Sequence, residues 1–321
     1  MKKKVLVCGA TGFIGRNIAE ALARGGKYEV SGTRLHSPAP RLPGVRIFKC
    51  DLTDRAAVSR AVKGVDIIVQ AAAVTSGAGD IVNSPWLHVT DNAVMNSLLF
   101  RAAHEHGVGQ LLFFSCSIMY GSSRRPVKED DLDANAPLHP AYFGAGWTKV
   151  YLERMCQFYA GLGRTRYTVV RHSNVYGPHD KFDLRRSHVF GATVTKVMTA
   201  PPGGEIKVWG DGGEARDLLY VSDLVSFVEK ALVRQRAPFG LFNAGAGRAV
   251  AVKDLVRRII AASGRDLRIV FDRSGPSIRT RLCLDSSRAA ARLGWKSRVG
   301  LEEGIRRTLR WYAAHRGELR L

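Results

Sequence analysis

The sequence predicts an α/β fold, with a doubly wound parallel sheet and a smaller α/β domain towards the carboxyl end. Short apolar runs alternate with helical patterns over the first half of the chain, as in β-α-β units. A glycine-rich turn directly follows the first run. After about residue 175 the alternation loosens and Gly, Pro and Arg become frequent. With 321 residues, 45% hydrophobic and 24% charged, the chain is long enough for two domains and has a globular composition.

The first apolar run ends at Gly9, and a helical pattern begins after Gly12. Gly9, Gly12 and Gly15 are spaced at i, i+3 and i+6 across this turn. Glycine allows a tight turn and leaves no Cβ between the backbone amides and a pyrophosphate, which the helix N-terminus attracts. We therefore predict a Rossmann dinucleotide site whose contacts are Gly9, Thr11, Gly12, Phe13, Ile14 and Gly15.

The second strand is expected at residues 28–34, and its end indicates which cofactor binds. An acidic residue there usually holds the ribose diol of NAD. Here Thr33 and Arg34 occupy that place, and an arginine suits a 2′-phosphate. The sequence therefore favours NADP, with NAD as the alternative. A solvent-exposed loop arginine is the competing interpretation of Arg34.

Further strands and helices complete the predicted sheet. We expect strands at 45–50, 65–70, 110–115 and 168–171, and helices at 55–63, 86–106 and 142–160. Asp54 or Thr53 is the expected cap of the helix at 55–63. The small residues Ala71, Ala72 and Ala73 follow the fourth strand, where they would let a cofactor lie close.

The rest of the chain is expected to form a substrate-binding part. Short strands at 218–221 and 241–243 flank a helix at 222–234, and helices near 251–262, 286–292 and 301–314 finish the chain. We therefore divide the chain into an NADP-binding Rossmann domain at 1–174, to which 216–246 returns, and a substrate-binding domain at 175–321.

Composition limits the other function classes. The net charge of +21 suits anionic ligands, but its basic residues are spread along the chain, so we expect a basic surface and no nucleic-acid role. The five scattered cysteines lack metal-ligand spacing, which indicates reduced thiols and no metal. No run is long enough to cross a membrane, and the sequence starts directly with the first strand. We expect a cytoplasmic protein.

Several motifs occur in order over nearly the whole chain. They are GATGFIG at 9–15, CDLTD at 50–54, AAA at 71–73, Asn92, SCSIMYG at 115–121, GWTK at 146–149, NVYGP at 174–178 and ARDLLYVSDL at 215–224. Together they resemble the extended short-chain dehydrogenase/reductase family, also called the NAD-dependent epimerase/dehydratase family. Within it, residues 180–196 and 207–221 are similar to the GDP-L-fucose synthase branch, NADPH-dependent 3,5-epimerase/4-reductases of a GDP-linked 4-keto sugar.

The resemblance implies roles for individual residues. Cofactor contacts would include Asp51, Leu52, Asn92 and Lys149. Epimerisation next to a ketone needs a base and an acid, which Cys116 and His188, respectively, would supply. Asn174 and His188 would meet the sugar, Arg216 the diphosphate, and Lys196 and Trp209 would be secondary substrate contacts. Alternatively, Cys116 is a small buried hydrophobe and Arg216 a surface residue.

Two departures from the family pattern affect the reduction step. The family uses a Ser or Thr, a Tyr, and a Lys four residues after the Tyr. Lys149 is present, but position 145 is alanine, and Cys116 stands at the Ser/Thr position beside Ser117. Tyr142, seven residues before Lys149, is the candidate replacement, although it is equally expected to pack at the helix start.

Three functions therefore remain open. The first is an NADP-dependent epimerase/reductase of a GDP-linked 4-keto sugar. The second is an epimerase without net reduction, and the third is a non-catalytic NADP-binding protein. By the same resemblance, helices 86–106 and 142–160 are expected to pair in a homodimer.

Overall fold

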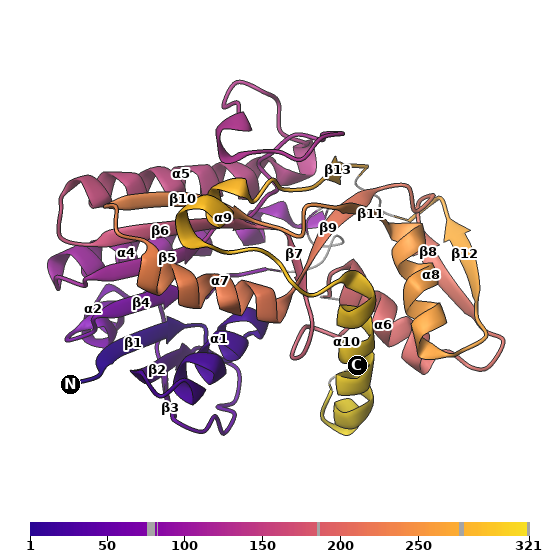
Figure 1. Cartoon of the computed structure of the whole chain (residues 1–321), viewed down its shortest axis with the longest axis horizontal. Coiled ribbons are helices and arrows are strands. Elements are labelled where there is room, and N and C mark those ends of the chain that lie inside the picture. The colour runs from indigo at the N-terminus through magenta and orange to yellow at the C-terminus, as the bar shows by residue number, and fades with distance from the viewer. Residues whose placement is uncertain (76–80, 82, 185–186, 276–278, 320–321) are drawn as a thin grey trace.

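The centre of the molecule is a sheet of seven parallel strands in the order β3-β2-β1-β4-β5-β6-β10 (Figure 1). The computed structural model describes residues 1–75, 81, 83–184, 187–275 and 279–319. The strands are β1 (Lys3–Cys8), β2 (Tyr28–Arg34), β3 (Val45–Lys49), β4 (Ile67–Gln70), β5 (Gln110–Phe114), β6 (Arg166–His172) and β10 (Phe239–Ala244). This arrangement confirms the predicted doubly wound parallel sheet.

The strand order reverses beside β1, which pairs with β2 on one side and with β4 on the other. Val5 lies opposite Val30 in β2 and opposite Ile67 in β4. In open parallel sheets, ligands bind outside the carboxyl ends of the strands at such a reversal. The glycine turn follows β1 at this end of the sheet.

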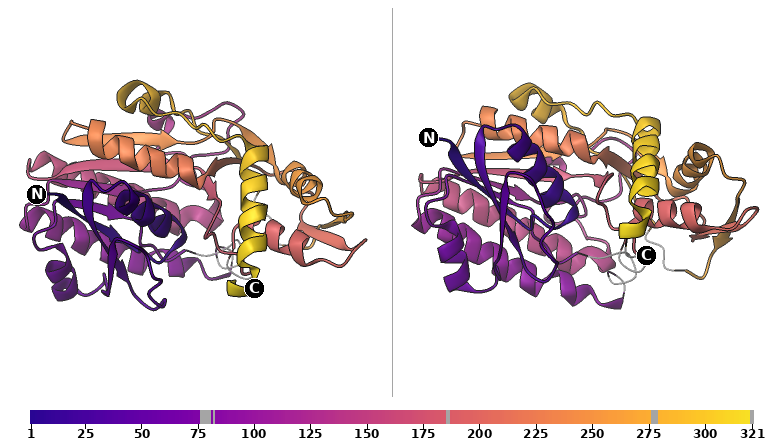
Figure 2. Two further views of the ribbon diagram at one scale, coloured as in Figure 1. Left: turned by 60° about the horizontal axis from the view of Figure 1, so that its bottom comes forward. Right: turned by 90° about the horizontal axis from the view of Figure 1, so that it is seen from below.

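Helices cover both faces of the sheet, as Figure 2 shows. One face packs against α1 (Phe13–Arg24), α7 (Val221–Arg234) and α9 (Ser287–Leu293), and the other against α2 (Arg55–Val62), α4 (Thr90–Glu105) and α5 (Phe143–Gly161). The α2 helix begins after Asp54, whose Oδ1 accepts from the backbone N–H of Ala56 at 2.8 Å. Asp54, rather than Thr53, is therefore the cap.

The helix predicted at 86–106 is divided in two. Pro85–His88 form a short 3₁₀-helix, η1, and α4 begins only at Thr90. The Asn92 side-chain amide donates to the His88 carbonyl oxygen at 3.0 Å and so satisfies an acceptor at the break. Periodicity alone did not reveal this interruption, because apolar residues continue across it.

A smaller part of the molecule lies beyond the carboxyl ends of the sheet strands (Figure 1). Its strands are β7 (Asn174–Tyr176), β9 (Ala215–Tyr220), β11 (Ala249–Ala251) and β13 (Arg281–Leu282), with the separate pair β8 (Glu205–Trp209) and β12 (Arg268–Asp272). The helices α6 (Val189–Thr199), α8 (Val252–Ser263) and α10 (Leu301–His315) share a core with these strands. The sequence predicted α8 and α10 but not the β8–β12 pair.

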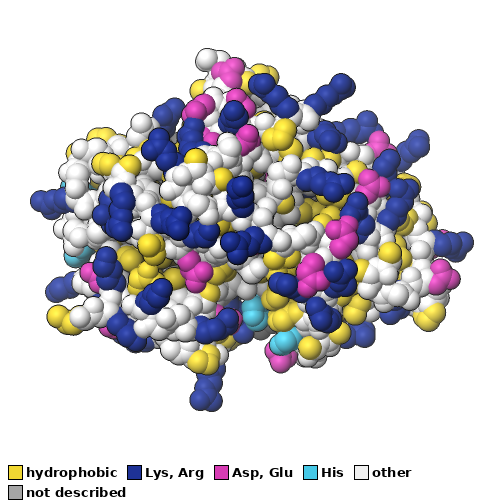
Figure 3. Space-filling view, viewed as in Figure 1, with side chains coloured by type: hydrophobic (Ala, Val, Ile, Leu, Met, Phe, Trp, Pro, Cys, Tyr) yellow, Lys and Arg dark blue, Asp and Glu magenta, His cyan; other side chains and the backbone are white. Residues whose placement is uncertain are grey.

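Basic side chains are scattered over the face seen in Figure 3 and are interspersed with fewer acidic ones. This distribution agrees with the spread-out charge expected from the sequence. In the part of the chain that the structure describes, no helix combines the length and apolar character needed to cross a membrane.

Candidate active site

The glycine turn is packed too tightly for side chains. Gly9 has a φ of +74°, and a Cβ there would lie 2.8 Å from the backbone of Ala72. A Cβ at Gly15 would overlap the carbonyl oxygen of Gly9. The first turn of α1 carries no acidic side chain, so its N–H groups remain suited to an anion. These residues fit the pyrophosphate of a dinucleotide.

The loop after β2 holds the candidate 2′-phosphate residue. Arg34 is half-buried and donates through Nη1 to the Ser37 carbonyl oxygen at 3.2 Å. Thr33, next to it, is buried and accepts from the Gly9 N–H through Oγ1 at 3.1 Å. The end of β2 is thus tied to the glycine turn, which brings Arg34 to the same edge of the sheet.

Two other predicted cofactor residues hold backbone in place. Asp51 accepts from the Thr53 N–H at 2.8 Å and from its hydroxyl at 2.6 Å, and these bonds lower the pKa of the Asp51 carboxyl. Asn92 exchanges two hydrogen bonds of 3.0 Å with the backbone of Val74. Asn92 therefore shapes the loop that follows Ala71, Ala72 and Ala73.

Cys116 and Lys149 lie together at the carboxyl end of β5. The Lys149 ammonium donates to the Phe114 carbonyl oxygen at 2.8 Å and lies 4.8 Å from the centre of the Phe113 ring. Burial raises the pKa of the Cys116 thiol, and the nearby Lys149 charge partly lowers it. Cys116 is half-buried, whereas Ser117 is buried, so Cys116 is the more accessible of the two.

Tyr142 precedes the expected tyrosine position, and the Cys116 thiol acts on the pKa of its phenol. It is the residue immediately before α5, while Ala145 lies in the first turn of the helix. Burial raises the pKa of the Tyr142 phenol, the Arg216 charge lowers it, and Cys116 and Glu214 raise it. The phenol is therefore in electrostatic range of Cys116, Arg216 and Glu214.

Two histidines, His188 and His172, are further candidate site residues. His188 immediately precedes α6 and is an exposed residue. The protein atoms close to its ring, and then the charges of Lys181 and His88, nevertheless lower its pKa to about 4. Its imidazole is thus neutral near pH 7.

Sequence reasoning missed the second histidine, His172, at the end of β6. It donates through Nδ1 to the Ser173 carbonyl oxygen at 2.8 Å, which leaves Nε2 as an acceptor. Burial, and then the charges of Lys149 and His188, lower its pKa to about 4. A histidine at the carboxyl end of a predicted sheet strand was the available signal.

Comparison with known proteins decides the family. The model of the NAD dependent epimerase/dehydratase family matches residues 5–245. This chain belongs to that family. A GDP-L-fucose synthase from Azorhizobium caulinodans is 30% identical over 320 residues, covering 97% of this chain and 96% of its own length. A dTDP-4-dehydro-6-deoxy-D-allose reductase from a Streptomyces species is 29% identical over 323 residues, covering 98% and 97%.

A solved structure supports the same assignment. The UDP-glucose 4-epimerase of Thermotoga maritima superposes with a TM-score of 0.86 at 25% identity, covering 97% of this chain and 99% of the epimerase. The family and these relatives comprise NAD(P)-dependent epimerases, reductases and dehydratases of nucleotide sugars. The resemblance stated from the sequence motifs is thereby confirmed.

The residues predicted to meet the sugar nucleotide in this epimerase/dehydratase family member lie in two groups. Arg216, in β9, donates through Nη1 to the Thr280 carbonyl and hydroxyl oxygens at 2.8 and 2.6 Å. Asn174 begins β7, which pairs with β9. Lys196 instead donates to the Lys207 carbonyl oxygen at 2.8 Å and lies 5.7 Å from the Trp209 ring centre. Lys196 and Trp209 therefore act as a contacting pair.

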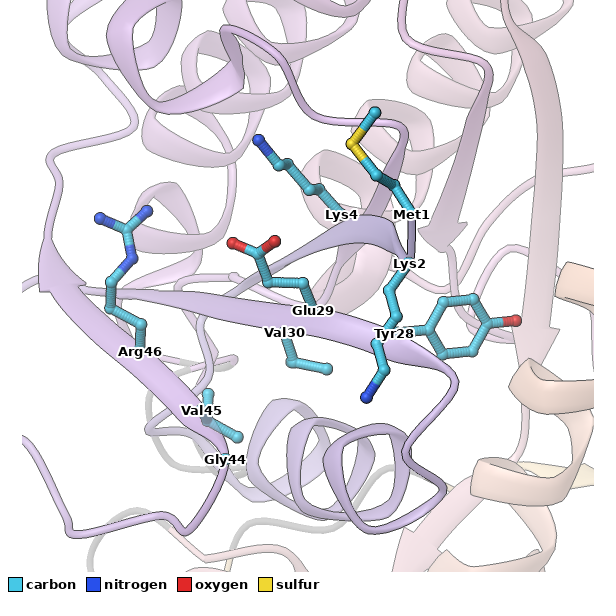
Figure 4. A pocket seen from close by; sticks show the side chains of 9 residues that line it. All are labelled: Met1, Lys2, Lys4, Tyr28, Glu29, Val30, Gly44, Val45 and Arg46. Carbon is cyan, nitrogen blue, oxygen red and sulfur yellow. The ribbon is translucent and has the colours of Figure 1, made fainter.

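A hollow of about 710 Å³ lies elsewhere, at the amino ends of β1, β2 and β3 (Figure 4). Lys4, Tyr28, Glu29 and Arg46 are among its lining residues. The glycine turn is at the opposite ends of these strands, so this hollow is separate from the cofactor site. Among the described residues, no group of three or more His, Cys, Asp or Glu side chains is arranged to hold a metal ion.

Proposed function

We propose that the chain is an NADP-dependent nucleotide-sugar epimerase/reductase that acts on a GDP-linked 4-keto sugar. The observation that carries the proposal is that Cys116 and Lys149 lie together at the carboxyl end of β5, with the Tyr142 phenol in electrostatic range of Cys116, in a member of this family. The GDP linkage is supported by the name of the 30% identical relative, a GDP-L-fucose synthase.

The cofactor is proposed to lie across the glycine turn. Gly9, Thr11, Gly12, Phe13, Ile14 and Gly15 would hold its pyrophosphate, Arg34 its 2′-phosphate, and Lys149 its nicotinamide ribose. NADPH supplies a hydride when bound. Residues 1–174, with 216–246, would form the cofactor part and 175–321 the sugar part. The bond between Thr33 and Gly9, which brings Arg34 to the turn, supports NADP over NAD.

We further propose that His188 and Cys116 move the protons of epimerisation, in reversed roles from those expected at first. The resting His188 imidazole is neutral, so it can accept the proton from the carbon beside the ketone. The Cys116 thiol is held protonated by burial, so it can return a proton to the opposite face of the enolate. Exchange with solvent then resets both groups.

Tyr142 is the proposed proton donor for the ketone oxygen during reduction. Ala145 has no proton to give, whereas the Tyr142 phenol stays protonated near neutral pH and is in electrostatic range of Cys116. The Lys149 ammonium stabilises negative charge that develops on the same oxygen. Arg216 would hold the diphosphate, Asn174 the sugar, and Lys196 with Trp209 the outer part of the substrate.

The second candidate is an epimerase without net reduction, and Ala145 is the observation that favours it. A non-catalytic NADP-binding protein is the third, and it requires Cys116, His188 and Arg216 to have no chemical role. Both proposed enzyme functions use Cys116 and His188 for epimerisation. Hydride transfer from NADPH is therefore the step that distinguishes them.

An incubation in D₂O with GDP-4-keto-6-deoxymannose and NADPH tests the proposal. Mass spectrometry follows deuterium in the sugar while absorbance follows NADPH. We expect deuterium uptake together with NADPH consumption. Uptake alone would establish the epimerase, and neither signal, also with a dTDP-linked 4-keto sugar, would refute both enzyme readings.

We also propose a cytoplasmic homodimer. Exposed apolar side chains lie on η1 and α5. Trp86 on η1 is 65% exposed, and on α5 Phe143 is 61%, Tyr151 55% and Phe158 63% exposed. Such a surface is typical of an interaction site, and a second copy would cover it. The five free cysteines suit a reducing compartment.

A further inference from the structure

A buried ion pair between Glu153 and Arg171 joins α5, which carries Lys149, to the end of β6, which carries His172. Glu153 lies on α5, one turn after Lys149, and Arg171 lies on β6, directly before His172. Arg171 Nη2 is 2.6 Å from Glu153 Oε2, and Arg171 Nε is 2.9 Å from Oε1. Their side chains are only 3% and 6% exposed, respectively. The pair is bidentate and is shielded from solvent.

The same carboxylate also holds the Cys116 segment. Ser115 Oγ donates to Glu153 Oε1 at 2.5 Å, and Ser115 immediately precedes Cys116. On the far side, Arg171 Nη1 donates to the Tyr120 hydroxyl at 2.7 Å, which itself donates to Asn243 Oδ1 at 2.9 Å. One carboxylate thus connects the end of β5, the α5 helix and the end of β6.

We propose that Glu153 is a positioning residue for the site. Its carboxylate holds Arg171 in place through the bidentate pair, and its negative charge offsets the Arg171 charge beside the thiol. The proposal rests on the proposed function only in that Cys116 and Lys149 belong to the reacting site.

The groups that face Cys116 come from several elements. Lys149 and Glu153 face it from α5, Arg171 from β6, Tyr142 from the residue before α5, and the Ile118 N–H from its own loop. Of the two paired charges, Glu153 raises the pKa of the thiol and Arg171 lowers it. Removing either charge alone therefore leaves the other unbalanced, and the two removals act in opposite directions.

The experiment measures the rate at which iodoacetamide alkylates Cys116 in the full chain, with peptide mass spectrometry to separate it from the other cysteines. The variants are Glu153→Gln, Arg171→Gln and the double variant. Ser115→Ala is the control, because it removes a hydrogen bond next to Cys116 and keeps both charges. No sugar substrate is needed, so a failure of the proposed function in the D₂O incubation is separate from a failure here.

At pH 8 we expect Glu153→Gln to alkylate about threefold faster and Arg171→Gln about threefold slower than the wild type, because the thiolate is the reacting form and the two charges act on the pKa of the thiol in opposite directions. The double variant and Ser115→Ala should stay near the wild-type rate. If both single variants change the rate in the same direction, or if Ser115→Ala matches Glu153→Gln, loosened packing explains the effect and the proposal is overturned. If one single variant does not fold, the other still tests the proposal, because its alkylation rate must change in the stated direction.

Discussion

The ammonium group of Lys149 donates a 2.8 Å hydrogen bond to the carbonyl oxygen of Phe114, the last residue of β5. This bond ties α5 to the strand end from which Cys116 follows. Burial lowers the pKa of Lys149, and the thiol of Cys116 counteracts this effect. The amine is therefore placed by the fold and does not depend on a phenol at position 145.

Replacing this amine should remove reduction without weakening the fold. We expect Lys149→Met to lower NADPH oxidation roughly a hundredfold or more, the usual size of a lost acid–base partner. Its melting temperature should stay level or rise, because methionine avoids the cost of burying a charge. Turnover and thermal melts measure both quantities, with the exposed Lys27→Met as control. Unchanged turnover in Lys149→Met would contradict the role proposed for Lys149.

The cofactor preference should depend on Arg34. A charged hydrogen bond to the 2′-phosphate contributes about 1.5–3 kcal/mol, so Arg34→Ala should bind NADPH about tenfold to a hundredfold more weakly. NADH lacks that phosphate, so its affinity should hardly change. Titration of protein fluorescence with each cofactor gives both constants. An equal loss of affinity for NADPH and NADH would mean that Arg34 does not contact the 2′-phosphate.

The sheet was predictable because its signals are local. Buried parallel strands are short apolar runs, and the runs at 28–34, 45–50 and 110–115 correspond closely to β2, β3 and β5. The β8–β12 pair was missed because many of its residues are exposed, so neither strand is a continuous apolar run, and because it lies outside the βα repeat. The break before Thr90 was missed because a side chain, Asn92, supports it.

The site was only partly predictable, because its arrangement depends on packing between distant segments. Motif spacing identified Lys149 and Cys116 and showed that position 145 lacks a phenol. It did not show that Cys116 and Arg216 act on the pKa of the Tyr142 phenol, nor that Glu153 pairs with Arg171. The direction of a side chain at a helix start and the pairing of charges between distant segments cannot be inferred from the local spacing of apolar residues.

Asp180 should make stability fall as pH rises. It is 8% exposed, its Oδ2 has no hydrogen-bond partner among the residues that the structure describes, and burial raises its pKa to about 7. The folded state therefore holds this proton more tightly than the unfolded state, and the stabilisation present at low pH is lost as pH rises through about 7.

Asp180→Asn should remove this dependence, because the amide is neutral at every pH and can still accept from the Lys181 N–H. We expect the free energy of unfolding to rise on the order of 4 kcal/mol at pH 8, and by about 2 kcal/mol less at pH 5.5. Denaturant unfolding at both pH values measures the difference. The exposed Asp91→Asn is the control, and an equal change at both pH values would contradict the assignment.

A charge placed on the apolar surface of α5 should dissociate the proposed homodimer. Phe158 is 63% exposed, and Phe158→Arg would bury an unpaired charge between two copies. Light scattering should report half the wild-type mass. Val233→Arg, on α7 at a residue 53% exposed, should leave the mass unchanged. A wild-type protein that is already monomeric would refute the homodimer.

The Tyr142→Phe variant tests most directly whether the Tyr142 phenol supports hydride transfer in place of a tyrosine at position 145. The wild type, Tyr142→Phe and the control Tyr151→Phe are incubated in D₂O with NADPH and GDP-4-keto-6-deoxymannose. We predict that Tyr142→Phe keeps deuterium uptake and loses NADPH oxidation, whereas the control keeps both. NADPH oxidation at the wild-type rate in Tyr142→Phe would contradict the account.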